Sequence, residues 1–166
     1  NILLFLNWGE YIDETLLEAF EEKYNCTVYM DLGESNEIFY SKVRGGTTVY
    51  DVVCPSDYMI EKMYRNDMLH EIDMTKLTEY NKLTERSGVK SIKDTMVNNT
   101  DRSIVNYFVP YLWGTWGIMY STEKEGLEDV VLNSANPWTC LFDRSKLPAG
   151  TKVAMYDSHQ HAYYAA

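Results

Sequence analysis

The chain has 166 residues and carries 25 acidic against 15 basic side chains, which gives a formal net charge of −10 at pH 7. This charge argues against a nucleic-acid-binding protein, because such proteins need a basic surface that displaces the counterions of the phosphates. Apolar residues make up 45% of the sequence, which is typical of a folded protein rather than a disordered one. The longest apolar run, residues 2–6, has the length of a buried strand and is far shorter than the roughly 20 residues that cross a membrane.

Strand and helix patterns alternate along the first 65 residues. The strand segments are rich in β-branched and aromatic residues, and the helical segments repeat apolar residues at the spacing of one helix face. Ser35 and Ser56 stand where helix N-caps are expected. This order, with its short connections, predicts an α/β domain with a largely parallel sheet. In chain order we expect a strand at 2–7, a helix from about 13, a strand at 26–30, a helix over 35–44, a strand at 50–54 and a helix from 56.

The later part of the chain has a different pattern. Residues 71–102 are polar, with a helical stretch around 74–82 and a predicted loop at 97–101. An apolar, β-rich block with a strand pattern follows at 107–120, and its glycines Gly114 and Gly117 indicate a bend or a close backbone approach. Beyond it we expect a short helix at 137–142, a strand at 152–156 and the start of a helix at 157–166.

Aromatic and acidic residues gather in the loops that follow the three predicted strands. Ligands of parallel sheets bind at the carboxyl ends of the strands, and loops there are exposed. Aromatic faces attract ammonium groups by about 0.5–2 kcal/mol and cover methylenes at about 0.8 kcal/mol each, while carboxylates fix the positions of positive charges. The pattern therefore favours a cation with a hydrocarbon body, although buried aromatics and solvated acids are the ordinary alternative. The residues are Trp8, Glu10, Tyr11, Glu34, Ser56, Asp57 and Tyr58, with Trp113, Trp116, Tyr156 and Asp157 further along.

The sequence lacks the signatures of common catalytic sites. It has no nucleophile elbow, no Walker loop and no dinucleotide fingerprint. Met74 stands where a zinc motif that begins at His70 would need its second histidine. A hydrolase triad of Asp157, His159 and Ser56 is a distant alternative that nothing in the spacing supports. We therefore expect no enzyme, no metal site and no cofactor.

Four sequence motifs resemble the spermidine/putrescine-binding proteins, the solute-binding components of polyamine ABC transporters. They are Trp-Gly-Glu-Tyr at 8–11, Gly-Glu-Ser-Asn-Glu at 33–37, Tyr-Asp-Val-Val-Cys-Pro-Ser-Asp-Tyr at 50–58 and Val-Pro-Tyr-Leu-Trp-Gly at 109–114. Their order and spacing agree with that family over nearly the whole chain, which resembles roughly the first half of a family member.

The resemblance implies a type II periplasmic-binding-protein fold with two α/β lobes. Residues 1–113 would form an incomplete first lobe, and residues 114–166 the crossing and the start of the second lobe. The implied function is that of an exported protein that captures putrescine or spermidine and delivers it to an ABC transporter permease. The alternative is another solute in the same fold, such as a different amine, an amino acid or a metal-bound anion. The absence of Arg and Lys from the three loops disfavours an anion.

The ligand residues that the resemblance implies come from both lobes. Two first-lobe loops match the family's aromatic wall and its polar-aromatic pair, and Gly9 stands where relatives often carry Thr. Asp157 matches the acid that receives a ligand amine from the second lobe. Gln160 replaces a second acid by a neutral amide, which favours a diamine over a triamine. The implied ligand set is Trp8, Gly9, Glu10, Tyr11, Ser56, Asp57, Tyr58, Asp157 and Gln160.

The second predicted lobe holds too few elements to cover both faces of a sheet. We therefore expect exposed apolar surface, self-association of this chain and a weaker hold on the ligand than in a complete two-lobed protein. We also expect the crossing between lobes within residues 114–117, because glycines there can absorb the dihedral changes of closure.

Overall fold

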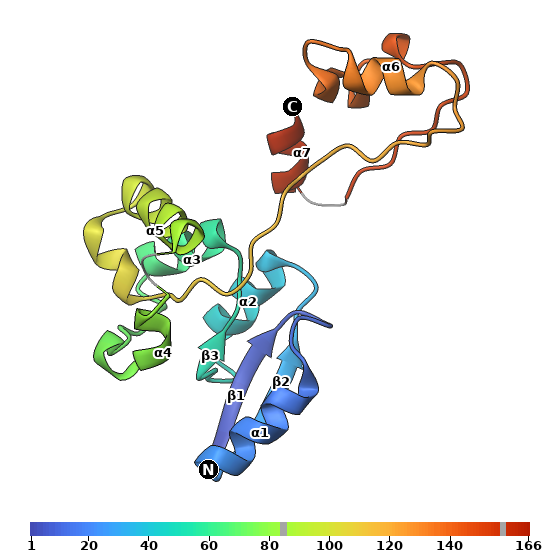
Figure 1. Cartoon of the computed structure of the whole chain (residues 1–166). Helices are drawn as coiled ribbons and strands as arrows, with labels where there is room; N and C mark the ends of the chain where they lie inside the picture. The colour runs from blue at the N-terminus through green and yellow to red at the C-terminus, as the bar shows by residue number, and fades with distance from the viewer. Residues whose placement is uncertain (84–85, 157–158) are drawn as a thin grey trace. The chain divides into compact units, whose positions relative to one another are not determined.

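A computed structural model describes residues 1–83, 86–156 and 159–166 of the chain (Figure 1). The chain divides into two units, Asn1–Leu112 and Trp113–Ala166. No helix in the described ranges is both long and apolar enough to cross a membrane.

Unit 1 contains a three-stranded parallel sheet in the order β2-β1-β3. The strands are β1 (Ile2–Asn7), β2 (Thr27–Leu32) and β3 (Val52–Val53), and the predicted α/β class with a parallel sheet is confirmed. β3 is shorter than the predicted strand at 50–54. The Asp51 carboxylate accepts a hydrogen bond from the backbone N–H of Leu4 at 2.8 Å, so a side chain takes the place of a backbone partner there.

Three helices of unit 1 begin close to the predicted positions. They are α1 (Glu14–Tyr24), α2 (Asn36–Gly45) and α3 (Asp57–Arg65). Asp13 caps α1 through its carboxylate, and the Ser35 hydroxyl caps α2 by accepting from the N–H of Ile38 at 3.2 Å. Gly46, with φ of 64°, ends α2 in the left-handed conformation that a C-cap prefers.

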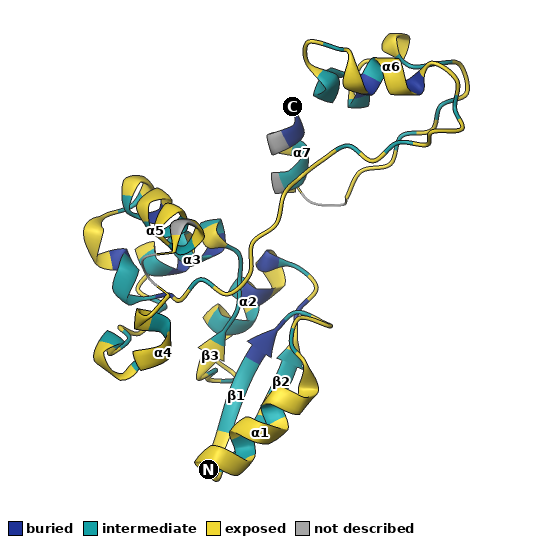
Figure 2. Cartoon of the chain, viewed as in Figure 1, coloured by how far each residue is buried: buried dark blue, intermediate teal, exposed yellow. Residues whose placement is uncertain are grey.

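The core of unit 1 lies on the sheet face that carries Leu6. Phe39 of α2 and Met59 and Met63 of α3 cover this residue, and all four side chains are fully buried. β1 is exposed at its start and buried at its carboxyl end (Figure 2). A Cβ at Gly33 would lie 2.6 Å from a ring carbon of Phe39, so the close approach of the two segments requires glycine.

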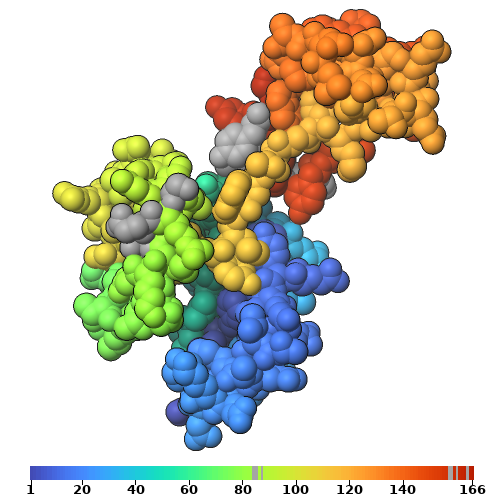
Figure 3. Space-filling view, in the orientation of Figure 1, coloured from blue at the N-terminus to red at the C-terminus, as the bar shows by residue number. Residues whose placement is uncertain are grey.

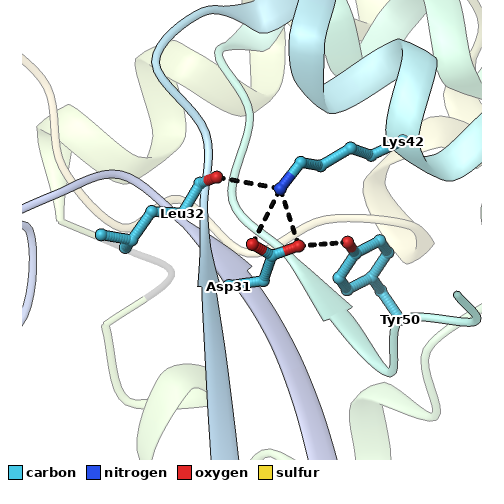
Figure 4. Close-up of polar contacts among 4 residues, drawn as sticks. All are labelled: Asp31, Leu32, Lys42 and Tyr50. Atoms are coloured by element: carbon cyan, nitrogen blue, oxygen red, sulfur yellow. Dashed lines mark hydrogen bonds and ion pairs between the residues drawn. The ribbon is translucent and has the colours of Figure 1, made fainter.

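A polar cluster ties β2, α2 and the residues before β3 together (Figure 4). The ammonium of Lys42 lies 2.7 Å from the Asp31 carboxylate and 3.0 Å from the carbonyl oxygen of Leu32, and the Tyr50 hydroxyl donates to the same carboxylate. The hydrogen bonds from Lys42 and Tyr50 lower the pKa of Asp31. The hydrogen bond to the same carboxylate raises the pKa of Tyr50 to about 12, because the ionised phenol could no longer donate it and would bring a second negative charge beside Asp31.

The rest of unit 1 is helical: η1 (Met74–Lys76), α4 (Thr78–Asn81), α5 (Ser87–Asn99) and η2 (Arg102–Asn106). The predicted loop at 97–101 is wrong over its first three residues, which belong to α5. Met96 of α5 packs with Ile104 and Phe108 in a second buried cluster. Ile92 and Met96 recur at helical spacing, and this signal could have predicted the helix.

Unit 2 contains α6 (Leu127–Leu132), η3 (Pro137–Leu141), η4 (Arg144–Lys146) and α7 (His159–Ala165). The short helix expected at 137–142 is present as η3, and α7 lies within the helix expected from 157. The strands expected within 107–120 and at 152–156 are absent, although the structure describes all of these residues. Apolar β-rich segments form strands only when a neighbouring strand pairs with their backbone, and these segments have no such ladder.

Part of the apolar surface of unit 1 is uncovered. No residue of α1 is buried, and in the space-filling view no other segment covers this helix on the face shown (Figure 3). Leu16 of α1 and Tyr29 of β2 are 60% and 68% exposed. The expectation of exposed apolar surface is met on these elements, and self-association stays a prediction.

Candidate functional site

Three loops meet at the carboxyl edge of the sheet: residues 8–11 after β1, 33–36 after β2 and 54–58 after β3. Hydrogen bonds join the loops to one another and to the end of β1. The N–H of Gly33 donates to the carbonyl oxygen of Asn7 at 2.9 Å, and the indole N–H of Trp8 donates to the carbonyl oxygen of Cys54 at 2.7 Å. The parallel topology therefore brings together the three loops in which the sequence places its aromatic and acidic residues.

Trp8 is fixed between the core and the loop edge. Its ring lies 4.7 Å from that of Phe39, centroid to centroid, and its indole N–H is held by Cys54. Burial raises the pKa of the Cys54 thiol. The half-buried indole is thus held by packing on one side and by a hydrogen bond at its nitrogen.

The chain turns immediately after Trp8. Gly9 is exposed, and the space where a Cβ would lie is open, so the position could hold a larger residue. Glu10 has a φ of 57°, in the left-handed region that non-glycine residues seldom adopt, and it is exposed. This conformation reverses the chain between the aromatic residues Trp8 and Tyr11.

Tyr11 forms the outer part of the aromatic surface. It is 42% exposed, and its ring centroid lies 6.3 Å from that of Trp8. Its backbone carbonyl oxygen accepts a hydrogen bond from the hydroxyl of Tyr111 at 2.7 Å. Tyr111 is absent from the predicted site, because only the folded chain shows that the segment around residue 111 returns to the first loop.

Asn36 and Ser56 form a double link between the second and third loops. The Asn36 carboxamide accepts from the backbone N–H of Ser56 at 2.8 Å and donates to its hydroxyl oxygen at 3.0 Å. Ser56 occupies the N-cap position of α3, but its side chain makes no capping bond to the helix. Asn36 is buried and was not predicted as a site residue, although an amide directly after the N-cap serine of α2 is a signal that could have identified it.

The two residues after Ser56 lie in different surroundings. Asp57 is exposed in the first turn of α3, and its carboxylate accepts from the N–H of Tyr58 at 2.8 Å. Tyr58 is half-buried and packs against the core cluster around Leu6. Asp57 therefore presents a charge at this edge, and Tyr58 anchors the loop.

The predicted ligand residues of the later segment are in unit 2. Asp157 lies outside the described residues, as does the side chain of Gln160, so their contacts with a ligand stay a prediction. Of the other aromatic residues singled out there, Trp116 stacks on His161 with ring centroids 4.2 Å apart, and Tyr156 meets the same imidazole edge-on at 4.9 Å.

The loop edge of unit 1 has a definite chemical character. It combines two aromatic faces with the exposed carboxylates of Glu10, Glu34 and Asp57, and the three loops contain no Lys or Arg. Aromatic faces and carboxylates both favour cations, and the rings also cover apolar surface. In the described part of the chain, no group of three histidine, cysteine or acidic side chains is arranged to hold a metal ion. The arrangement is suited to an organic cation.

Three of the matches with known proteins are consistent with one another. The spermidine/putrescine-binding periplasmic protein of Escherichia coli is 34% identical over 119 residues, which is 71% of this chain and 32% of that protein. The putrescine/cadaverine-binding protein of Pseudomonas aeruginosa is 28% identical over 99% of this chain and 43% of its own length. The crystal structure of the TpPotD lipoprotein of Treponema pallidum has a TM-score of 0.57 at 29% identity, covering 68% of this chain and 33% of that one.

These matches confirm the resemblance drawn from the four motifs and the predicted binding-protein fold. The chain spans about a third of the length of the E. coli protein and less than half that of the P. aeruginosa protein. Residues 1–139 match the family described as "Hypothetical lipoprotein (MG045 family)". The match covers more than half of the chain, and the chain therefore belongs to this lipoprotein family.

Proposed function

We propose that this protein is the solute-binding component of a polyamine transporter. It captures putrescine or spermidine outside the cytoplasm and delivers it to an ABC transporter permease, without a catalytic role. The observation that carries this proposal is the meeting of three loops at one sheet edge, where aromatic faces and carboxylates lie together without a basic residue. The relatives in E. coli and P. aeruginosa, which are named as binding proteins for spermidine, putrescine and cadaverine, support the same class of solute.

The chemistry of a polyamine fits the residues of this edge. Its methylene chain would lie on the faces of Trp8 and Tyr11, and its ammonium groups would pair with carboxylates. Glu10 and Asp57 are exposed. They follow Trp8 and Cys54, the two residues that a hydrogen bond joins, by two and three positions. The hydroxyl of Ser56, held by Asn36, would accept one further N–H of the ligand. Tyr58 and the backbone of Gly9 complete this wall.

The second wall is proposed to come from the segment after residue 113. Asp157 would receive the far ammonium group. The neutral amide of Gln160 accepts a hydrogen bond but offers no full charge, so we propose that a diamine binds more tightly than a triamine. We also propose that the crossing between the two lobes lies within residues 114–117; the division of the chain into two units after Leu112 supports this position.

The proposed location is outside the cytoplasm, on or near the membrane. The family to which the chain belongs is described as a lipoprotein family, and its relative in E. coli is described as periplasmic. Both descriptions are those of exported proteins, which is where a solute-binding component meets its solute.

Calorimetry on the native chain that contains residues 1–166 tests the proposal. Putrescine and spermidine should bind with 1:1 stoichiometry, whereas glutamate and citrate should not. Asp157→Ala should strand a desolvated ammonium and cost roughly 3–5 kcal/mol of binding free energy. Asp94→Asn, an exposed acid on α5 of unit 1, is the matched control and should leave affinity within twofold. Binding of glutamate or citrate but of neither polyamine would refute the function, and an Asp157→Ala variant within twofold of wild type would refute the site.

A further inference from the structure

The contact between Tyr111 and Tyr11 joins residues that are 100 positions apart in the sequence. The hydroxyl of Tyr111 donates to the carbonyl oxygen of Tyr11 at 2.7 Å, and the two rings meet edge-on with centroids 6.4 Å apart and planes at 60°. Tyr111 is therefore attached to the first loop both through its hydroxyl and through its ring.

This contact joins the first loop to a segment without regular secondary structure. Residues 109–112 form no strand or helix, and in the described ranges no backbone hydrogen bond joins them to the rest of unit 1. The Tyr111 side chain is half-exposed, so burial in a core does not explain its position. The unit boundary follows directly at Leu112.

We propose that Tyr111 is a positioning residue for the ligand wall: it fixes Tyr11 to the segment through which the chain leaves unit 1. The proposal rests on the proposed function, since the wall in question is the polyamine wall. The bond holds the loop of residues 8–11 by the carbonyl at its end, beyond the strained residue Glu10. It keeps the ring of Tyr11 beside that of Trp8.

Two consequences follow for ligand binding. The Tyr111 hydroxyl occupies one of the two lone pairs of the Tyr11 carbonyl oxygen, which leaves that oxygen a single acceptor site for a ligand ammonium. A displacement of residues 109–112 must also move Tyr11, because the hydrogen bond and the ring contact tie the two segments together. The loop of residues 8–11 and the segment of residues 109–112 therefore move together when the protein closes on its ligand.

The experiment compares two changes at residue 111 with a matched control. Tyr111→Phe removes the hydroxyl and keeps the ring, whereas Tyr111→Leu removes both. The control is Tyr107→Phe, four residues earlier in the chain, whose ring packs edge-on against Tyr64 of α3 with centroids 5.0 Å apart. Putrescine affinity is measured by calorimetry on the native chain that contains residues 1–166, and amide hydrogen exchange is recorded for residues 8–12 and for β2.

Loss of one hydrogen bond of this kind should weaken putrescine binding about fivefold in Tyr111→Phe and more in Tyr111→Leu, with Tyr107→Phe within twofold of wild type. Exchange should rise in residues 8–12 and stay unchanged in β2, a pattern that a general loss of stability would not give. If wild type binds putrescine and Tyr111→Phe binds it equally well, or if exchange rises equally in β2, the positioning role is wrong and the function stands. If wild type binds no polyamine, the function is wrong and this role falls with it.

Discussion

Replacement of Asn36 by alanine should destabilise unit 1 without removing any apolar core contact. The carboxamide is buried, with 7% of the residue exposed, and makes two hydrogen bonds to Ser56, at 2.8 and 3.0 Å. A net contribution of about 0.5–1.5 kcal/mol per bond, with a partly buried N–H of Ser56 left unpaired, gives a loss of about 2 kcal/mol.

The unfolding of unit 1 can be followed separately, because Trp8 is the single tryptophan among residues 1–112. A variant in which the other three tryptophans, Trp113, Trp116 and Trp138, are phenylalanine reports on this unit through the emission of Trp8. Urea titration should show a lower midpoint for Asn36→Ala at an unchanged slope. Asn98→Ala, an exposed position on α5, is the control and should change stability by no more than about 0.5 kcal/mol.

The Asn36→Ala change should also weaken ligand binding. Without Asn36 no amide holds the hydroxyl of Ser56, which is then free to turn away from the loop edge towards the N-terminus of α3, where it makes no capping bond in the wild-type structure. Putrescine affinity should therefore fall together with stability. A loss of stability below 0.5 kcal/mol for Asn36→Ala would refute the assignment of this pair as the link between the second and third loops.

Two further changes test other parts of unit 1. Gly33→Ala would place its Cβ 2.6 Å from a ring carbon of Phe39, so it should lower the free energy of unfolding by about 1–3 kcal/mol in the same urea titration. The control is Gly45→Ala, whose Cβ would meet open space and should not destabilise the protein. Folding lowers the pKa of Asp31, so this residue stabilises the folded state fully at a pH above its unfolded-state pKa of 3.8. The stabilisation is lost as the pH falls through the lower pKa of the folded state. Lys42→Met should therefore reduce the loss of stability between pH 5 and pH 2, by about 0.5–1 kcal/mol for this half-exposed pair, and an unchanged pH profile would contradict the role of the lysine.

The alternation of strands and helices in the first 65 residues is predictable from sequence because local signals agree there. The cap at Ser35, the left-handed C-cap at Gly46 and the β-branched strands all favour the same elements. The edge at which the three loops meet follows from parallel topology alone. The positions of Trp8, Tyr11 and Ser56 at that edge could therefore be predicted without the structure.

Long-range contacts could not be predicted in the same way. Tyr111 reaches Tyr11 across 100 positions, and no local pattern indicates which hydroxyl meets which carbonyl. The strand expected within residues 107–120 failed for a related reason, since β-propensity gives a segment a preference but does not supply the neighbouring strand that it needs. The partner of Asn36 is likewise set by the packing of α2 beside α3, and only its burial and two hydrogen bonds reveal its role.

The most direct test of polyamine binding at this edge is a titration of the variant in which Trp8 is the single tryptophan. Putrescine should change the emission of Trp8 in a saturable way, with the same dissociation constant that calorimetry gives. Butylamine, which has one ammonium group, should bind far more weakly. Magnesium ions, added to the same concentration of positive charge as putrescine, should leave the emission unchanged. Saturable putrescine binding by calorimetry with no change in Trp8 emission would place the ligand elsewhere, and no binding of any diamine or triamine would contradict the proposed function itself.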